Sequence, residues 1–145
     1  MNADMTPIRV LSVDDHPLLR EAVAALLSSQ SDMTLVAEAS NGHEAIEQFR
    51  VHHPDVTLMD LQMPQMDGLD AMIAIRQEFP RARIIVLTTY AGDVQVLRAI
   101  KAGARAYLLK SLVRKWAEGI AELIIRKEFV GIRLPLSLVS CRSWS

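Results

Sequence analysis

Five residues of this chain have side chains that suit phosphate and metal chemistry, and all of them follow short apolar runs. They are Asp14 and Asp15 after 8–13, Asp60 after 56–59, Thr88 after 84–87 and Lys110 after 107–109. If these runs are parallel strands, their C-terminal ends lie along one edge of a sheet, where α/β folds bind ligands. Three carboxylates, a hydroxyl and an ammonium group would then meet in one crevice.

The three carboxylates predict a metal site. Carboxylates held within a few ångströms repel one another, and one of them would otherwise bind a proton. Mg²⁺ removes this conflict, because it prefers oxygen ligands and binds through one or two carboxylates together with a phosphate. The alternative for Asp14 and Asp15 is a turn that also caps the next helix, and spacing alone leaves both open. For His16, a solvent-facing place at the helix start is favoured over a role as a titrating neighbour.

The other three residues each have a functional and a structural interpretation. The Asp60 carboxylate could act as a nucleophile toward phosphorus, or Asp60 could be a turn residue ahead of Pro64. Thr88 could donate its hydroxyl to a phosphoryl oxygen, or simply favour the strand. Lys110 could pair with a phosphoryl oxygen, worth roughly 4 kcal/mol before desolvation at about 4 Å, or with a neighbouring aspartate. Their shared position at strand ends favours the functional interpretation.

Alternating apolar runs and helical periodicity predict the elements that position these residues. The runs 56–59 and 84–87 are continuously apolar, which is typical of parallel strands buried on both faces. Ile73 and Leu97 are expected on buried helix faces. The predicted fold class is α/β, a doubly wound, five-stranded parallel sheet within residues 8–127. Strands are predicted at 8–13, 34–39, 56–59, 84–87 and 107–109. Helices are predicted at about 17–28, 68–78, 93–102 and 113–127, with another between the cap signal at 40–42 and Pro54.

Length and composition fit one domain and argue against several classes of protein. The chain has 145 residues, half of them apolar, and a net charge of −1 without a basic block. It has no apolar run near the roughly 18 residues of a membrane-spanning helix, and residues 1–7, the expected leader, lack a signal-peptide pattern. We therefore expect a cytoplasmic protein with no membrane partner and no direct nucleic-acid binding by this chain. Residues 128–145 are expected to be an atypical tail without a complete output domain, because 129–145 show no clear period.

Taken together, these motifs resemble the receiver domain of two-component response regulators, which has a flavodoxin-like, CheY-like fold. The resemblance covers about residues 8–127. It is carried by Asp14-Asp15, Asp60 within MDLQMPQMDG, Thr88, and YLLK ending at Lys110. Finer features resemble the subfamily in which a LuxR-type helix-turn-helix domain follows the receiver. These are His16-Pro17, LTTY at 87–90 and Gly103-Ala104.

The resemblance implies a role for each acidic residue. Asp60 would be the phosphoacceptor, taking a phosphoryl group from a phosphohistidine on a sensor histidine kinase. Asp15 and Asp60 would ligate Mg²⁺ directly and Asp14 through water. The backbone carbonyl of Gln62 would complete the protein ligands.

The resemblance also implies a switch. Lys110 and Thr88 would contact the phosphoryl group, and Tyr107 would rotate as Thr88 moves inward. A new charge of roughly −1.5 to −2 would bias a two-state element and change protein–protein contacts. Receivers like this one often pair. The expected partners are therefore a sensor histidine kinase and a second copy of the chain. DNA binding is expected only where a full-length protein carries an output domain.

Two other functions compete with this one. A small Mg²⁺-dependent phosphatase also uses an aspartate nucleophile, but it usually has a second aspartate two residues later, where this chain has Gln62. A transcription factor complete in this chain would need a second domain and basic charge. We expect no enzyme in the ordinary sense, only self-phosphorylation from a phosphodonor and autodephosphorylation.

Overall fold

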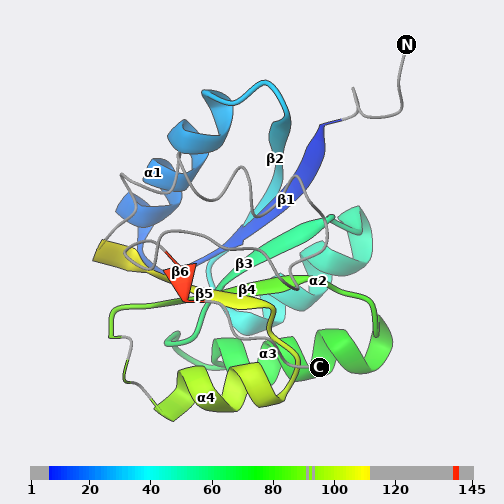
Figure 1. Cartoon of the computed structure of the whole chain (residues 1–145). Coiled ribbons are helices and arrows are strands. Elements are labelled where there is room, and N and C mark those ends of the chain that lie inside the picture. Colours follow the sequence, from blue (N-terminus) through cyan, green and yellow to red (C-terminus); the bar gives the residue numbers. More distant parts are fainter. Residues whose placement is uncertain (1–6, 91, 93, 112–138, 141–145) are drawn as a thin grey trace.

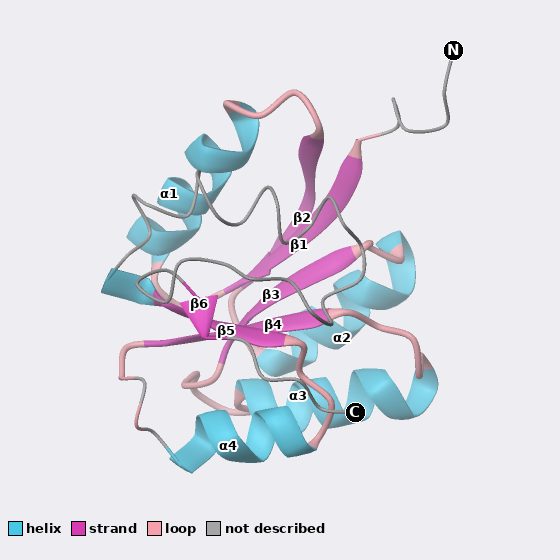
Figure 2. Cartoon of the chain, viewed as in Figure 1, coloured by secondary structure: helices cyan, strands magenta, loops and turns pink. Residues whose placement is uncertain are grey.

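The computed structural model describes residues 7–90, 92, 94–111 and 139–140, and these form a central sheet with helices on both faces (Figure 1). Figure 2 shows α1 on one face and α2, α3 and α4 on the other. The strands are β1 (Ile8–Val13), β2 (Met33–Ala39), β3 (Val56–Asp60), β4 (Ile84–Thr88), β5 (Ala106–Leu109) and β6 (Val139–Ser140). The helices are α1 (Pro17–Ser28), α2 (Gly42–His52), α3 (Gly68–Glu78) and α4 (Val94–Lys101).

The sheet has the strand order β2-β1-β3-β4-β5-β6, and its first five strands are parallel. The order reverses at β1, which lies between β2 and β3, so a crevice forms at the carboxyl ends of β1 and β3. The register aligns these ends, because Val13 is opposite Met59 and Asp60 is opposite Leu87. Thr88 is opposite Leu109, which directly precedes Lys110.

The two central strands β3 and β4 are buried at all five of their positions. Successive side chains point to opposite faces, so Leu58 and Leu87 pack in the core under α1, whereas Met59 and Val86 pack in the core under α2, α3 and α4. This two-sided burial explains why the predicted runs are continuously apolar. The predicted doubly wound parallel sheet is therefore confirmed.

Helix ends are set by local chemistry. Pro17 starts α1 at a position where its missing N–H costs nothing. Asn41 caps α2 by accepting a hydrogen bond from the Glu44 N–H at 2.9 Å, and Asp67 caps α3 by accepting from the Asp70 N–H at 2.9 Å. These caps place the loops after β2 and β3 beside the crevice.

Two details of the prediction are wrong. Ile73 is 38% exposed and Leu97 is 44% exposed, because each follows a buried residue, Met72 or Val96, and the next position along a helix is turned away from the core. The sheet also has a sixth strand, β6, which pairs antiparallel with β5 through Leu108–Val139 and Tyr107–Ser140. A two-residue strand in a segment without periodicity carries no pattern from which to predict it.

The remaining predictions for the C-terminal part lie outside the described residues. These are the fifth helix at 113–127 and, apart from β6, the tail at 128–145. Within the described ranges, the longest helix has 12 residues, and no helix combines the length and apolarity that a bilayer crossing requires.

Candidate functional site

The carboxyl ends of four parallel strands bring together the residues that the sequence singled out. Asp60 and Thr88 are the last residues of β3 and β4, while Asp14 and Lys110 directly follow β1 and β5. Asp14, Asp60 and Thr88 are buried, with at most 4% of each residue exposed. The sheet register therefore places these four residues along one edge of the sheet.

Lys110 joins the two buried carboxylates. Its Nζ lies 2.9 Å from Asp60 Oδ1 and 3.0 Å from Asp14 Oδ2. The Lys110 side chain is 11% exposed, and those of Asp14 and Asp60 are 1% and 2% exposed. One ammonium group thus faces two carboxylates in a place that is largely closed to water, where ion pairs are stronger and an unpaired charge is costly.

Asp15 and His16 form the outer part of the site. His16 Nδ1 lies 2.8 Å from Asp14 Oδ1 and 3.1 Å from Asp15 Oδ1. The His16 side chain is 64% exposed, so the predicted solvent-facing position is confirmed, but its ring also contacts both carboxylates. His16 therefore lies at the helix start facing solvent and beside the acid pair at the same time.

Burial raises the pKa of the Asp60 carboxyl from its ordinary 3.8 to about 6. The hydrogen bond from Lys110 acts against this increase, and repulsion from Asp14 adds to it. Burial lowers the pKa of Lys110, but hydrogen bonds to Asp60 and Asp14 outweigh burial and raise it above its ordinary value. The ammonium group is therefore held in its charged form between the carboxylates.

The donor set fits a hard divalent cation. Ligand atoms of Asp14, Asp15, His16 and Asp60 all lie within 4.8 Å of one another. Asp60 Oδ2 is buried and has no hydrogen-bond partner within the part of the chain that the structure describes. Three carboxylates opposite one ammonium leave negative charge in excess, and oxygen ligands suit Mg²⁺.

Gln62 lies at the mouth of this site. Its N–H donates a hydrogen bond to Asp60 Oδ1 at 3.2 Å. Together with Asp15, Asp67 and Gln95 it lines a cavity of about 390 Å³ next to the carboxylates. This space suits a phosphodonor group and the waters that Mg²⁺ usually keeps.

Thr88 is at the predicted strand end, but its hydroxyl is bound within its own loop. Thr88 Oγ1 donates to the carbonyl oxygen of Tyr90 at 3.1 Å and accepts from the Tyr90 N–H at 3.2 Å. No hydrogen bond joins Thr88 to Asp60 or Lys110 in the described residues. Tyr107 is half-buried and packs against the core under α3 and α4.

Two residues that position the site were missed by the sequence reasoning. Arg20 of α1 donates from Nη1 to the Asp14 carbonyl oxygen at 2.6 Å, and its Nε lies 3.5 Å from Glu38. Gly68 packs against the backbone of Asp60 so closely that a side chain there would collide with it. The glycine after Asp67 was the available signal, since glycine often marks a close backbone approach.

Comparisons with known proteins agree with this geometry. Residues 10–117 match the family described as the response regulator receiver domain. The chain is 41% identical over 118 residues to the response regulator protein VraR of Staphylococcus saprophyticus, covering 81% of this chain and 55% of VraR. It is 41% identical over 108 residues to VraR of Staphylococcus aureus, covering 74% of this chain and 52% of that protein. The chain thus spans about half the length of the curated relatives it matches.

Solved structures that resemble this chain are also response regulators. The response regulator domain of Thermotoga maritima CheB has a TM-score of 0.77 and 31% identity, covering 83% of this chain and 96% of that one. A LuxR-family two-component response regulator from Aurantimonas sp. SI85-9A1 has a TM-score of 0.75 and 34% identity, covering 82% and 86% of the two chains. These similarities favour a receiver over the phosphatase alternative. The chain belongs to the response regulator receiver domain family.

Proposed function

We propose that Asp60 is the phosphoacceptor of this receiver and that its phosphorylation switches the protein's contacts with partners. The observation that carries the proposal is the difference between the contacts of the two Asp60 carboxylate oxygens. Its Oδ1 is held by Lys110 Nζ at 2.9 Å, while its buried Oδ2 has no partner among the described residues. One oxygen is therefore oriented and the other is available for a bond to phosphorus.

In the proposed transfer, an oxygen of Asp60 attacks the phosphorus of a phosphohistidine on a sensor histidine kinase. The new O–P bond forms as the N–P bond breaks, and the electron pair of that bond stays on the imidazole nitrogen. Lys110 pairs with an oxygen of the transferred group. Asp15 and Asp60 would hold Mg²⁺, with Asp14 acting through water and Gln62 through its carbonyl oxygen. When bound, Mg²⁺ offsets the negative charge on the phosphoryl oxygens.

The switch would begin at Thr88. Its hydroxyl now bonds the backbone of Tyr90, at 3.1 Å and 3.2 Å, and a phosphoryl oxygen near Asp60 would offer it a charged acceptor instead. Movement of Thr88 and Tyr90 would then change the face that includes α4 and Tyr107. We propose a kinase and a second copy of the chain as partners of the switch. Control of transcription would require the part of the longer relatives that this chain does not match.

The proposal is tested by intact mass after incubation with acetyl phosphate and Mg²⁺. The wild-type chain should gain a single addition of about 80 Da, one phosphoryl group, and a chelator should prevent it. Asp60→Asn should gain nothing, whereas the control Asp70→Asn, at an exposed position of α3, should behave like the wild type. An addition of the same size and yield in Asp60→Asn would overturn the assignment.

A further inference from the structure

A cavity of about 450 Å³ lies at the opposite end of the sheet from the phosphoryl site. Residues just before β3 and β4 line it, among them Asp55, Arg81 and Arg83. The phosphoryl site is at the other end of the same two strands, about 16 Å away for five strand residues. This cavity is therefore a separate site, and its volume lies in the range of roughly 300–1,000 Å³ that is typical of small-molecule sites.

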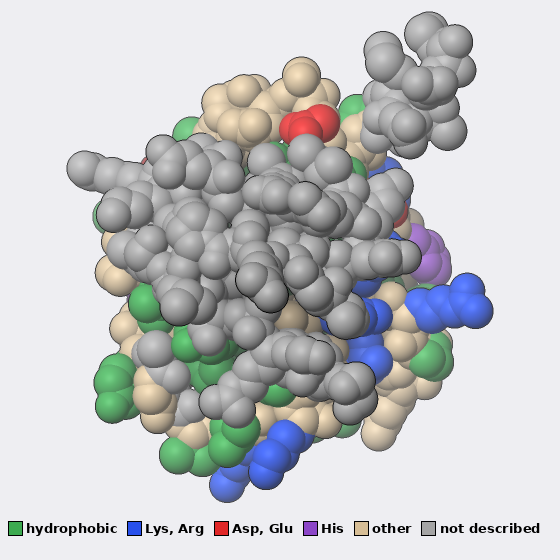
Figure 3. Space-filling view, in the orientation of Figure 1, with side chains coloured by type: hydrophobic (Ala, Val, Ile, Leu, Met, Phe, Trp, Pro, Cys, Tyr) green, Lys and Arg blue, Asp and Glu red, His purple; other side chains and the backbone are tan. Residues whose placement is uncertain are grey.

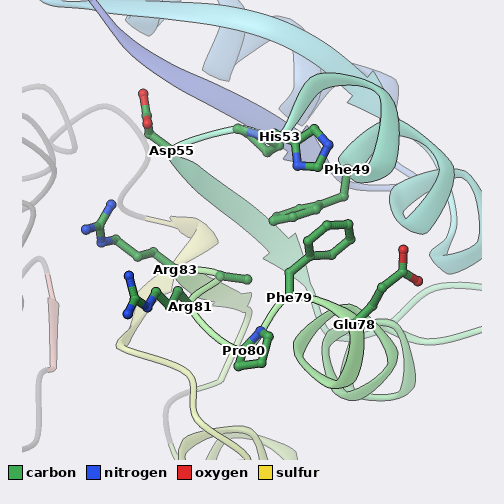
Figure 4. Close-up of a pocket in the computed structure, with 10 residues that line it drawn as sticks. Phe49, His53, Asp55, Glu78, Phe79, Pro80, Arg81 and Arg83 are labelled. Atoms are coloured by element: carbon green, nitrogen blue, oxygen red, sulfur yellow. The ribbon is translucent and has the colours of Figure 1, made fainter.

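One wall of the cavity is aromatic (Figure 4). The rings of Phe49 and Phe79 have centroids 4.9 Å apart, and the His53 ring meets Phe79 edge-on at 5.1 Å and 87°. Phe49 and His53 are 6.4 Å apart at 62°. These three rings come from the end of α2 and the end of α3. Phe49 is buried behind the other two rings, and the exposed His53 and half-buried Phe79 offer planar surface to a planar ligand.

The wall is fixed in place by β1. His53 has φ 45° and ψ 60°, a left-handed conformation that is uncommon for residues other than glycine. The Arg9 side chain donates to the carbonyl oxygen of His53 at 3.0 Å, and the Arg9 N–H donates to Asp55 Oδ2 at 2.9 Å. The cavity therefore exists before any ligand arrives, which lowers the entropic cost of binding.

The other side of the cavity is basic. Arg81 and Arg83 extend in the same direction from the segment before β4 (Figure 4). Figure 3 also shows lysine and arginine side chains grouped beside a histidine on one side of the molecule. In the described part of the chain, neither guanidinium group has an ion pair or a hydrogen bond. Glu78, which also lines the cavity, is by contrast paired with Arg50 at 2.9 Å.

We propose that this cavity binds a small organic anion with a planar aromatic ring. The ring would lie against His53 and Phe79, which pack on Phe49, and the carboxylate or phosphate group would accept hydrogen bonds from Arg81 and Arg83. Two neighbouring guanidinium groups without an acceptor favour an anion, because their planar donors match carboxylate and phosphate oxygens. The proposal is independent of phosphorylation at Asp60.

The test is a titration of the ¹⁵N-labelled full chain with three compounds, followed by amide NMR. Indole-3-acetate has a ring and an anion, indole-3-acetamide has the ring alone, and acetate has the anion alone. Indole-3-acetate should shift the amides of His53, Phe79 and Arg81–Arg83 saturably, and should bind about tenfold more tightly than the amide, the size of one charge-assisted hydrogen bond. Equal affinity for indole-3-acetate and indole-3-acetamide would overturn the proposal. An absence of saturable shifts at these positions with indole-3-acetate would also overturn it.

Variants separate anion recognition from general effects. Replacing Arg81 and Arg83 together by glutamine should abolish the preference for indole-3-acetate and leave the weak binding of indole-3-acetamide unchanged. Arg81→Gln alone should reduce the preference for indole-3-acetate over indole-3-acetamide. Because Arg81 is exposed, this single variant can be measured even if the double variant unfolds. Arg98→Gln on the exposed face of α4 is the matched control, and Asp60→Asn should bind like the wild type. A preference that survives loss of both arginines would contradict the assignment.

Discussion

A side chain on Gly68 would collide with the carbonyl oxygen of Asp60, so α3 begins directly against the backbone of the proposed phosphoacceptor. A Cβ atom at Gly68 would also lie 2.8 Å from the Asp60 carbonyl carbon and 2.9 Å from the Cα atom of Leu61. The Gly68 N–H donates to the Leu61 carbonyl oxygen at 3.1 Å. The backbone position of Asp60 therefore depends on the absence of a side chain at residue 68.

Gly68→Ala should destabilise the fold and displace Asp60. The obstacle is backbone, which cannot rotate away as a side chain can, so we expect a loss of about 2–4 kcal/mol in the free energy of unfolding. Urea denaturation measures this loss, and the rate of phosphorylation by acetyl phosphate should fall as well. Gln77→Ala, at an exposed position of the same helix, is the control and should change little. Unchanged stability in Gly68→Ala would contradict this contact.

Lys110→Met should destabilise the protein near neutral pH by about 3 kcal/mol, because it leaves two buried carboxylates without their counter-charge. The pKa of Asp60 should rise further above 6, since the hydrogen bond from Lys110 acts to lower it. Added Mg²⁺ should restore part of the lost stability. Lys101→Met, at an exposed position of α4, is the comparison. Equal unfolding midpoints for the two variants in chelator would show that the ion pairs contribute nothing.

In chelator, the Asp60 carboxyl should titrate near pH 6, as followed by carboxyl ¹³C NMR. Its pKa in the unfolded chain is about 3.9, so the folded state binds the proton more tightly between about pH 4 and pH 6. The contribution of the Asp60 carboxyl to the free energy of unfolding is therefore fully present below about pH 4, and it is lost as pH rises through about 6. Adding Mg²⁺ should move the midpoint downward, because a cation favours the carboxylate.

Asp60→Asn should consequently stabilise the apo protein at pH 7.5, by an amount on the order of 2 kcal/mol, and much less at pH 4. The amide has nearly the shape of the carboxylate but carries no buried charge. Urea unfolding of both proteins in chelator at the two pH values gives the comparison. The same difference at both pH values would rule out the raised pKa as its cause.

Mg²⁺ should raise the unfolding temperature of the wild type, because a ligand that binds only the folded state stabilises it by mass action. Asp15→Asn should weaken this response, whereas Asp70→Asn on the surface of α3 should retain it. Differential scanning fluorimetry across Mg²⁺ concentrations measures both. A full response in Asp15→Asn would remove that carboxylate from the proposed ligand set.

The sequence by itself determined the parallel sheet and the residues that meet at its edge. Continuously apolar runs such as 56–59 and 84–87 indicate strands covered on both faces, and parallel strands end on the same side. Asp60 and Lys110 were therefore identified as neighbours without coordinates. Short-range signals also fixed helix boundaries, as Pro17 does for α1.

Only the tertiary structure decided which atoms contact one another. It placed Lys110 between Asp14 and Asp60, turned the Thr88 hydroxyl to Tyr90, and brought His16 onto the acid pair. These contacts depend on side-chain rotamers and on strand register between segments far apart in the chain, and neither is encoded in local periodicity. The cavity beside Phe79 arises in the same way, because α2, α3 and β1 meet there only once the sheet is assembled.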